Sequence, residues 1–139
     1  MENIQNKNIS RRFLRDAFLL ILVVAALDFI GIKFYFYWSL HYYDSVVHFL
    51  AGITVGLGSL WIWMHITKKE LTQKQVVVVA LIGASIIGVL WEIFEVTNGI
   101  TSFADGIHYV TDTGSDLLMD VCGGIVASVY AWKIILKVR

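Results

Sequence analysis

Four long runs of apolar residues, separated by short polar segments, dominate this sequence. Each run reaches the length of about 20 residues that an α-helix needs to cross the hydrocarbon core of a bilayer. We therefore expect transmembrane helices over residues 13–38, 44–66, 75–97 and 116–136. The chain is 58% hydrophobic, whereas soluble domains are roughly 45–50% apolar. The expected fold is all-α, a polytopic membrane four-helix bundle in which residues 1–139 form a single domain.

The basic residues predict the orientation of this bundle. They gather before the first run, between the second and third runs, and at the end of the fourth, and Lys33 alone lies elsewhere. Because Lys and Arg are enriched in cytoplasmic segments, we expect both termini in the cytoplasm (N-in/C-in) and the loops 39–43 and 98–115 outside. The gathered residues are Lys7, Arg11, Arg12, Arg15, Lys68, Lys69, Lys74, Lys133, Lys137 and Arg139.

Ionisable side chains inside the expected helices form three groups near their outer ends. Asp44 and His48 are four residues apart, so they share one face of the second helix. Glu92 and Glu95 are three residues apart at the end of the third helix. Charged residues at the bilayer centre cost about 2.5–3.5 kcal/mol on insertion scales, so they usually face the bundle interior and mark function. The third group, at the start of the fourth helix, is Asp112, Asp116 and Asp120.

The three groups are expected at one depth in the membrane. The second and fourth helices enter from outside and the third leaves there, and Glu92 lies ~9 Å below the helix end at a rise of about 1.5 Å per residue. Gly52, Gly88 and Gly123 adjoin the groups, and such small residues let membrane helices approach closely. We predict that the groups converge into one site at the outer membrane face.

Six carboxylates at close range cannot all stay ionised without compensation, and Lys33 supplies a single opposite charge. Protonation or a bound cation is therefore required. Oxygen-rich donor sets favour Mg²⁺, Mn²⁺ or Ca²⁺, and one imidazole shifts the preference toward Mn²⁺, Fe²⁺ or Zn²⁺. The predicted cofactor is a divalent metal ion (Mg, Mn, Zn or Fe). Its expected ligands are Asp44, His48, Glu92, Asp112 and Asp116, with Asp120 and Asp28 as additional candidates.

Simpler roles compete with this interpretation. Asp44 and Asp116 each open an expected helix, where Asp is a preferred N-cap residue, and His48 could be structural. Capping does not explain Glu92 and Glu95, because the helix dipole disfavours anions at a C-terminus. This pair is therefore the strongest argument for a site.

Three motifs, YDSVVHF, WEIFE and DTGSDLLMD, occur in this order within residues 40–128. Together they resemble the YjdF-type family of bacterial inner-membrane proteins and, more distantly, VanZ-like membrane proteins. The resemblance implies a bacterial plasma (inner) membrane location. The link of VanZ-like proteins to glycopeptide resistance implies a role in the cell envelope. The residues that carry the resemblance are Asp44, His48, Glu92, Glu95, Asp112, Thr113, Ser115 and Asp116.

Two classes of function fit these patterns. The first is a metal-dependent enzyme acting on a lipid-linked or phosphate-bearing envelope molecule, with Glu95 as general base and His48 as a second catalytic residue. The alternative is a non-enzymatic protein that binds or transports a cation or solute, or a structural envelope partner. The lipid bilayer is an expected partner, and Gly52 with Gly56 would suit a homo-oligomer interface. Nucleic acid is not expected, because the basic residues form only short groups at helix ends.

Overall fold

The computed structural model describes residues 4–40 and 42–138, and within these ranges the chain forms helices and connecting turns without strands. The all-α expectation is therefore confirmed for the described residues. The elements are α1 (Ile4–Lys33), the short α2 (Phe36–Ser39), α3 (Tyr43–Thr67), α4 (Gln73–Thr97), the 3₁₀ turn η1 (Phe103–Asp105) and α5 (Ile107–Val138).

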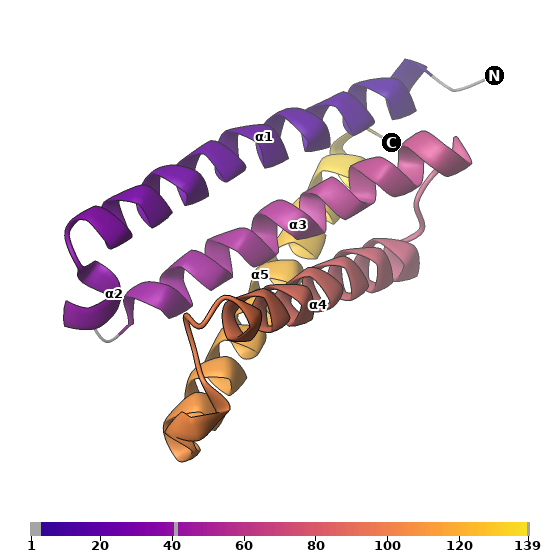
Figure 1. Ribbon diagram of the computed structural model, residues 1–139. Coiled ribbons are helices and arrows are strands. Elements are labelled where there is room, and N and C mark those ends of the chain that lie inside the picture. The colour runs from indigo at the N-terminus through magenta and orange to yellow at the C-terminus, as the bar shows by residue number, and fades with distance from the viewer. Residues whose placement is uncertain (1–3, 41, 139) are drawn as a thin grey trace.

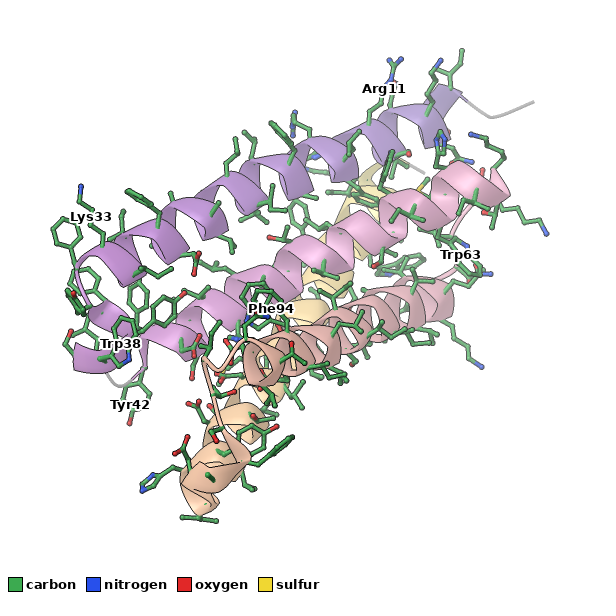
Figure 2. The ribbon with its side chains drawn as sticks, viewed as in Figure 1. Arg11, Lys33, Trp38, Tyr42, Trp63 and Phe94 are labelled. Carbon is green, nitrogen blue, oxygen red and sulfur yellow. The ribbon has the colours of Figure 1, made fainter. Side chains whose placement is uncertain are left out.

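Helix α3 is the centre of the bundle and contacts α1, α4 and α5. In Figure 1, α1, α3 and α4 run alongside one another, and α5 crosses behind them. The start of α1, the α3–α4 loop and the end of α5 lie at one end of the molecule, which we call the basic end. In Figure 2, Arg11 and Trp63 mark the basic end, whereas Lys33, Trp38 and Tyr42 lie at the opposite end.

Three of the described helices, α3, α4 and α5, are long and apolar enough to cross a membrane. Their outward surfaces agree with this, since Ile82, Ile86 and Ile93 of α4 are each 54% exposed. An apolar surface of this extent marks contact with lipid or with another protein. Inside the bundle, Leu57 and Leu60 of α3 are buried.

Helix α1 differs from the expected first span over residues 13–38. It begins earlier, at Ile4, and ends at Lys33. Tyr35 then adopts a left-handed backbone conformation with φ of 61°, which an α-helix cannot contain, so the chain turns before α2. The 30 residues of α1 are long enough to span a bilayer, but charged residues interrupt its apolar run. A fourth span and the N-in/C-in orientation therefore stay predictions.

Helix α5 begins at Ile107, well before the expected start at residue 116. The segment before residue 116 is rich in Thr, Gly, Ser and Asp, which are weak helix formers, and its sequence resembles a loop. In the structure the Thr111 hydroxyl donates to the Ile107 carbonyl at 3.0 Å, and Thr113 bonds to α4. Because of this longer helix, Asp112 lies on α5 rather than in a loop before it.

Small residues bring α3 and α5 into backbone contact. A Cβ atom added at Gly52 would collide with the Asp120 backbone, and one at Gly123 would collide with the Phe49 carbonyl. Gly56 likewise packs against Ala127 of α5. Since α5 covers this face within the same chain, the pair Gly52 and Gly56 gives no support to a homo-oligomer.

We expect Gly52→Ala to lower stability by about 1–3 kcal/mol or more, because the backbone of α5 cannot move aside as a flexible side chain would. The matched control is Gly58→Ala on the same helix, where an added Cβ meets nothing within 4 Å. That control should be neutral or slightly stabilising, since Ala is a better helix former than Gly. Thermal unfolding of the detergent-solubilised protein measures both, and equal melting temperatures would contradict the expectation.

Candidate functional site

The ionisable groups of α3, α4 and α5 converge, as the sequence predicts. They form three overlapping sets, and within each set the potential ligand atoms all lie within 4.8 Å of one another. We call the residues of these sets the acidic cluster. The sets are Asp44, His48 and Glu95; His48, Glu92 and Asp116; and Asp44, Asp112 and Asp116.

Each helix supplies its members near the end opposite the basic end. Asp44 lies in the first turn of α3, and Glu95 lies in the last turn of α4. Asp116 lies well inside α5, so the N-cap interpretation of this residue is wrong. Asp44 does not cap α3 either, because the N-cap position is Tyr42 and no side-chain cap bond is present there.

Exposure differs among the residues of the acidic cluster, so we call its buried residues the floor and its two more exposed residues, Asp44 and Asp112, the mouth. His48 and Glu92 are each 5% exposed, Glu95 is 7% exposed and Asp116 is 2% exposed. Asp112 is exposed and Asp44 is half-buried. The two aspartates of the mouth are therefore the members of the cluster most accessible from outside.

Two oxygens on the floor lack hydrogen-bond partners. Thr113 donates to Glu92 Oε2 at 2.7 Å, but Glu92 Oε1 and Asp116 Oδ1 are buried with no hydrogen-bond partner. Leaving a buried polar group unsatisfied costs about 1–3 kcal/mol, and more when the group is charged. Both residues belong to the set around His48, and a cation or a proton could supply the missing partners.

His48 is held between two carboxylates. Its Nδ1 lies 3.2 Å from Asp120 Oδ2, and its Nε2 lies 3.6 Å from Asp44 Oδ1. With the proton on Nδ1 donated to Asp120, the lone pair of Nε2 faces the acidic cluster. Asp120 itself fits into the space that Gly88 leaves, because a Cβ there would collide with its carboxylate. Asp120 therefore orients His48 and belongs to none of the three sets.

Glu95 has a fixed orientation because Trp91, one turn earlier on α4, donates its indole N–H to Glu95 Oε1 at 3.0 Å. The sequence alone assigns no bonding role to Trp91 or Thr113. The spacing of Trp91 and Glu95, four residues apart on one helix, was the signal available for this bond. A hydrogen bond between two helices, such as that from the Thr113 hydroxyl to Glu92, leaves no regular spacing in the sequence.

Two further charged residues of α1 stay outside the acidic cluster. Asp28 accepts a hydrogen bond from the Tyr37 hydroxyl at 2.9 Å and belongs to none of the three sets found among the described residues. The Lys33 ammonium lies over the rings of Phe29 and Phe34, 5.7 Å and 5.8 Å from their centroids. Lys33 therefore does not neutralise the cluster through any ion pair within the described part of the chain.

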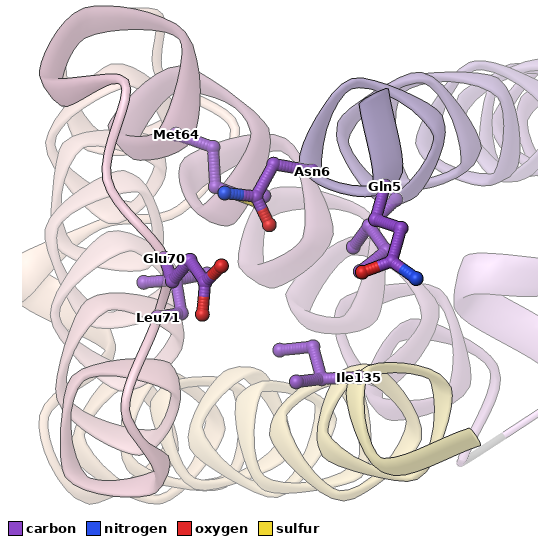
Figure 3. Close-up of a pocket in the computed structure, with 7 residues that line it drawn as sticks. Gln5, Asn6, Met64, Glu70, Leu71 and Ile135 are labelled. Carbon is purple, nitrogen blue, oxygen red and sulfur yellow. The ribbon is translucent and has the colours of Figure 1, made fainter. Parts of the chain in front are cut away.

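A small cavity lies at the basic end, far along the bundle from the acidic cluster. It is lined by residues of α1, α3, α5 and the α3–α4 loop, among them Asn6, Met64 and Glu70 (Figure 3). Its volume is about 20 Å³, which is room for a water molecule and no organic ligand. This cavity therefore gives no candidate site for an organic ligand.

The fold and the acidic cluster together define a helical integral membrane protein with a buried carboxylate and histidine site. Over residues 6–137 the chain matches the family described as "Predicted membrane protein (DUF2238)", and it belongs to that family. Comparison with curated proteins and with solved structures gives no match.

Replacement of Thr113 by Val should destabilise the protein, purified in the presence of a chelator, by about 1–3 kcal/mol, because it leaves both oxygens of the buried Glu92 unsatisfied. The matched control is Thr111→Val, since that exposed hydroxyl bonds only to carbonyls of its own helix. Thermal unfolding in detergent compares the two variants. An equal effect would show that the bond between Thr113 and Glu92 contributes nothing specific.

Proposed function

We propose that this protein is a metalloprotein of the bacterial inner membrane that binds a divalent cation in the acidic cluster and acts on a phosphate-bearing, lipid-linked envelope molecule. The observation that carries the proposal is the pair of buried, unpartnered oxygens on Glu92 and Asp116, in the same set as His48. Buried charges are normally paired or bound to a metal. A divalent cation would satisfy both oxygens at once and use the lone pair of His48.

The donor set supports particular metals. Carboxylate oxygens suit Mg²⁺ and Mn²⁺, whereas one imidazole among them favours Mn²⁺, Fe²⁺ or Zn²⁺. The bond between His48 Nδ1 and Asp120 is the outer contact that metal-ligating histidines usually make. Asp120 thus acts as a positioning residue, and the ligands are those expected from the sequence.

The membrane orientation follows from α1 as a fourth span. The stretch from Arg11 to Lys33 is ~33 Å long at about 1.5 Å per residue, close to the ~30 Å of the hydrocarbon core. Phe18, Ile21 and Leu22 between them are more than half exposed, as residues facing lipid would be. With the basic end in the cytoplasm, the acidic cluster lies at the extracytoplasmic face.

The side chains of the cluster support phosphoryl or related ester chemistry. A bound divalent cation would supply charge neutralisation for a phosphate group. Glu95, oriented by Trp91, is the candidate general base, and the mouth formed by Asp44 and Asp112 would admit the head group. The resemblance to YjdF-type and VanZ-like proteins supports an envelope substrate.

Cation transport is the alternative, since buried acids are common in ion pathways. A continuous path would need further unpaired acids toward the basic end. There, Asp16 is paired with Arg15 at 2.7 Å and accepts a hydrogen bond from Tyr130 at 2.7 Å. This pairing favours a binding site at one face over a conduit through the membrane.

The purified protein, loaded with Mn²⁺ and desalted in detergent, should retain stoichiometric metal by elemental analysis. Glu92→Gln and His48→Ala should each lose most of it, because they remove ligands from the buried floor. Asp105→Asn, in the exposed turn η1, is the control and should retain wild-type content. Wild-type protein that holds no stoichiometric metal after resupply with Mn²⁺, Zn²⁺, Fe²⁺ and Mg²⁺ would refute the proposed function.

Asp120→Asn should weaken Mn²⁺ affinity by about 10–100-fold without removing the site, as loss of an outer-shell partner of a ligating histidine does elsewhere. Titration with Mn²⁺ should therefore reach the wild-type stoichiometry at higher metal concentration. If Asp120→Asn instead abolishes binding as Glu92→Gln does, Asp120 is a ligand and its positioning role is wrong.

A further inference from the structure

The three sets of the acidic cluster overlap in a regular way. Each pair of sets shares one residue, and the set around Glu92 meets the set around Asp112 only at Asp116. Those two sets together use five residues, which are Asp44, His48, Glu92, Asp112 and Asp116. Glu95 remains outside both of them.

Asp116 has the geometry of a shared ligand. On α5 it lies between Asp112 and Asp120, each four residues away, so the three aspartates share one helix face. Its side chain is buried, at 2% exposure, and Oδ1 has no hydrogen-bond partner. Because a carboxylate has two oxygens, Asp116 can give one to a cation in each set.

Charge also exceeds what one cation can offset. The carboxylates of the three sets and Asp120 are six acidic groups around a single imidazole. One divalent cation would leave most of this negative charge uncompensated. Like charges this close destabilise one another, and Lys33 makes no ion pair here within the described residues. Protonation or a second cation must therefore compensate the charge, and the buried, unpartnered Oδ1 of Asp116, a member of both sets, favours the cation.

We propose that the acidic cluster is a two-ion centre in which Asp116 bridges the cations. One cation is held on the floor by His48, Glu92 and Asp116. The other is held at the mouth by Asp44, Asp112 and Asp116, and it exchanges faster because Asp112 is exposed. This inference rests on the proposed function and deepens it. Paired cations about 3.5–4 Å apart clamp both the attacking and the leaving oxygen of a phosphoryl group, so the substrate class is a phosphate ester or anhydride.

The arrangement assigns separate roles to the remaining residues. Glu95 lies close to Asp44 and His48 and is bonded to Trp91, so it stays available as a base beside both cations. Asp112 becomes the residue on which the second cation depends. Asp112 is not among the residues of the floor. A substitution at Asp112 should therefore remove the second cation and leave the first in place.

Elemental analysis and electron paramagnetic resonance of the Mn²⁺-loaded full chain in detergent test this inference. Wild type should hold about two Mn²⁺ per chain, as a two-metal site does, and show an exchange-coupled spectrum. Asp112→Asn should hold half as much and show the hyperfine pattern of an isolated ion. Brief exposure of wild type to a chelator should give the same state, which serves as a check that needs no mutation. Asp105→Asn, also exposed but outside the cluster, should behave as wild type.

The outcomes separate this inference from the proposed function. Wild type with a single, uncoupled Mn²⁺ that Asp112→Asn leaves unchanged would overturn the two-ion centre and leave the proposed metal site intact. Wild type without bound metal would overturn both. A coupled spectrum that Asp112→Asn abolishes while one Mn²⁺ remains would establish the two-ion centre.

Discussion

The backbone contact between α3 and α5 is the constraint on which the site depends. Gly52 and Gly123 carry no Cβ atoms, so the two helices touch at the level of Asp120 and Phe49. Association of helices in a membrane relies on such close packing, because lipid is as apolar as the side chains it would replace. The same contact sets His48 beside Asp120 and, one turn nearer the mouth, Asp44 near Asp116. The same few residues therefore determine both how α3 packs against α5 and where the ionisable side chains lie.

The acidic cluster then carries an energetic cost that the fold must offset. Four of its ionisable groups, and Asp120 beside them, are at most 7% exposed, and desolvation of each charge costs several kcal/mol unless it is paired. The protein pairs some of them internally: Thr113 with Glu92, Trp91 with Glu95, and Asp120 with His48. Glu92 Oε1 and Asp116 Oδ1 remain buried without a hydrogen-bond partner. These two oxygens are the basis for proposing a bound metal ion in place of a purely structural role.

Spacing within helices made much of this arrangement predictable. Asp44 with His48, and Glu92 with Glu95, share a helix face because 3.6 residues complete one turn, and the adjoining glycines indicated close approach. The start of α5 was not predictable in this way, because Thr111 and Thr113 belong to a loop-like segment, and the bond from Thr113 to Glu92 of α4 is a contact between helices. The end of α1 was also missed, since the apolar run continues past the left-handed turn at Tyr35. Local patterns carry no information on such tertiary contacts.

The length of α5 has a consequence for how the acidic cluster meets its surroundings. Its 32 residues extend ~48 Å at about 1.5 Å per residue, against a hydrocarbon core of ~30 Å. Even a tilt of about 40°, the upper end of the range for such helices, leaves ~37 Å along the bilayer normal. A helix of this length that spans the bilayer therefore extends beyond the hydrocarbon core at one end or at both. Asp112, in the second turn of α5, is among the residues that such an extension would carry toward the lipid head groups.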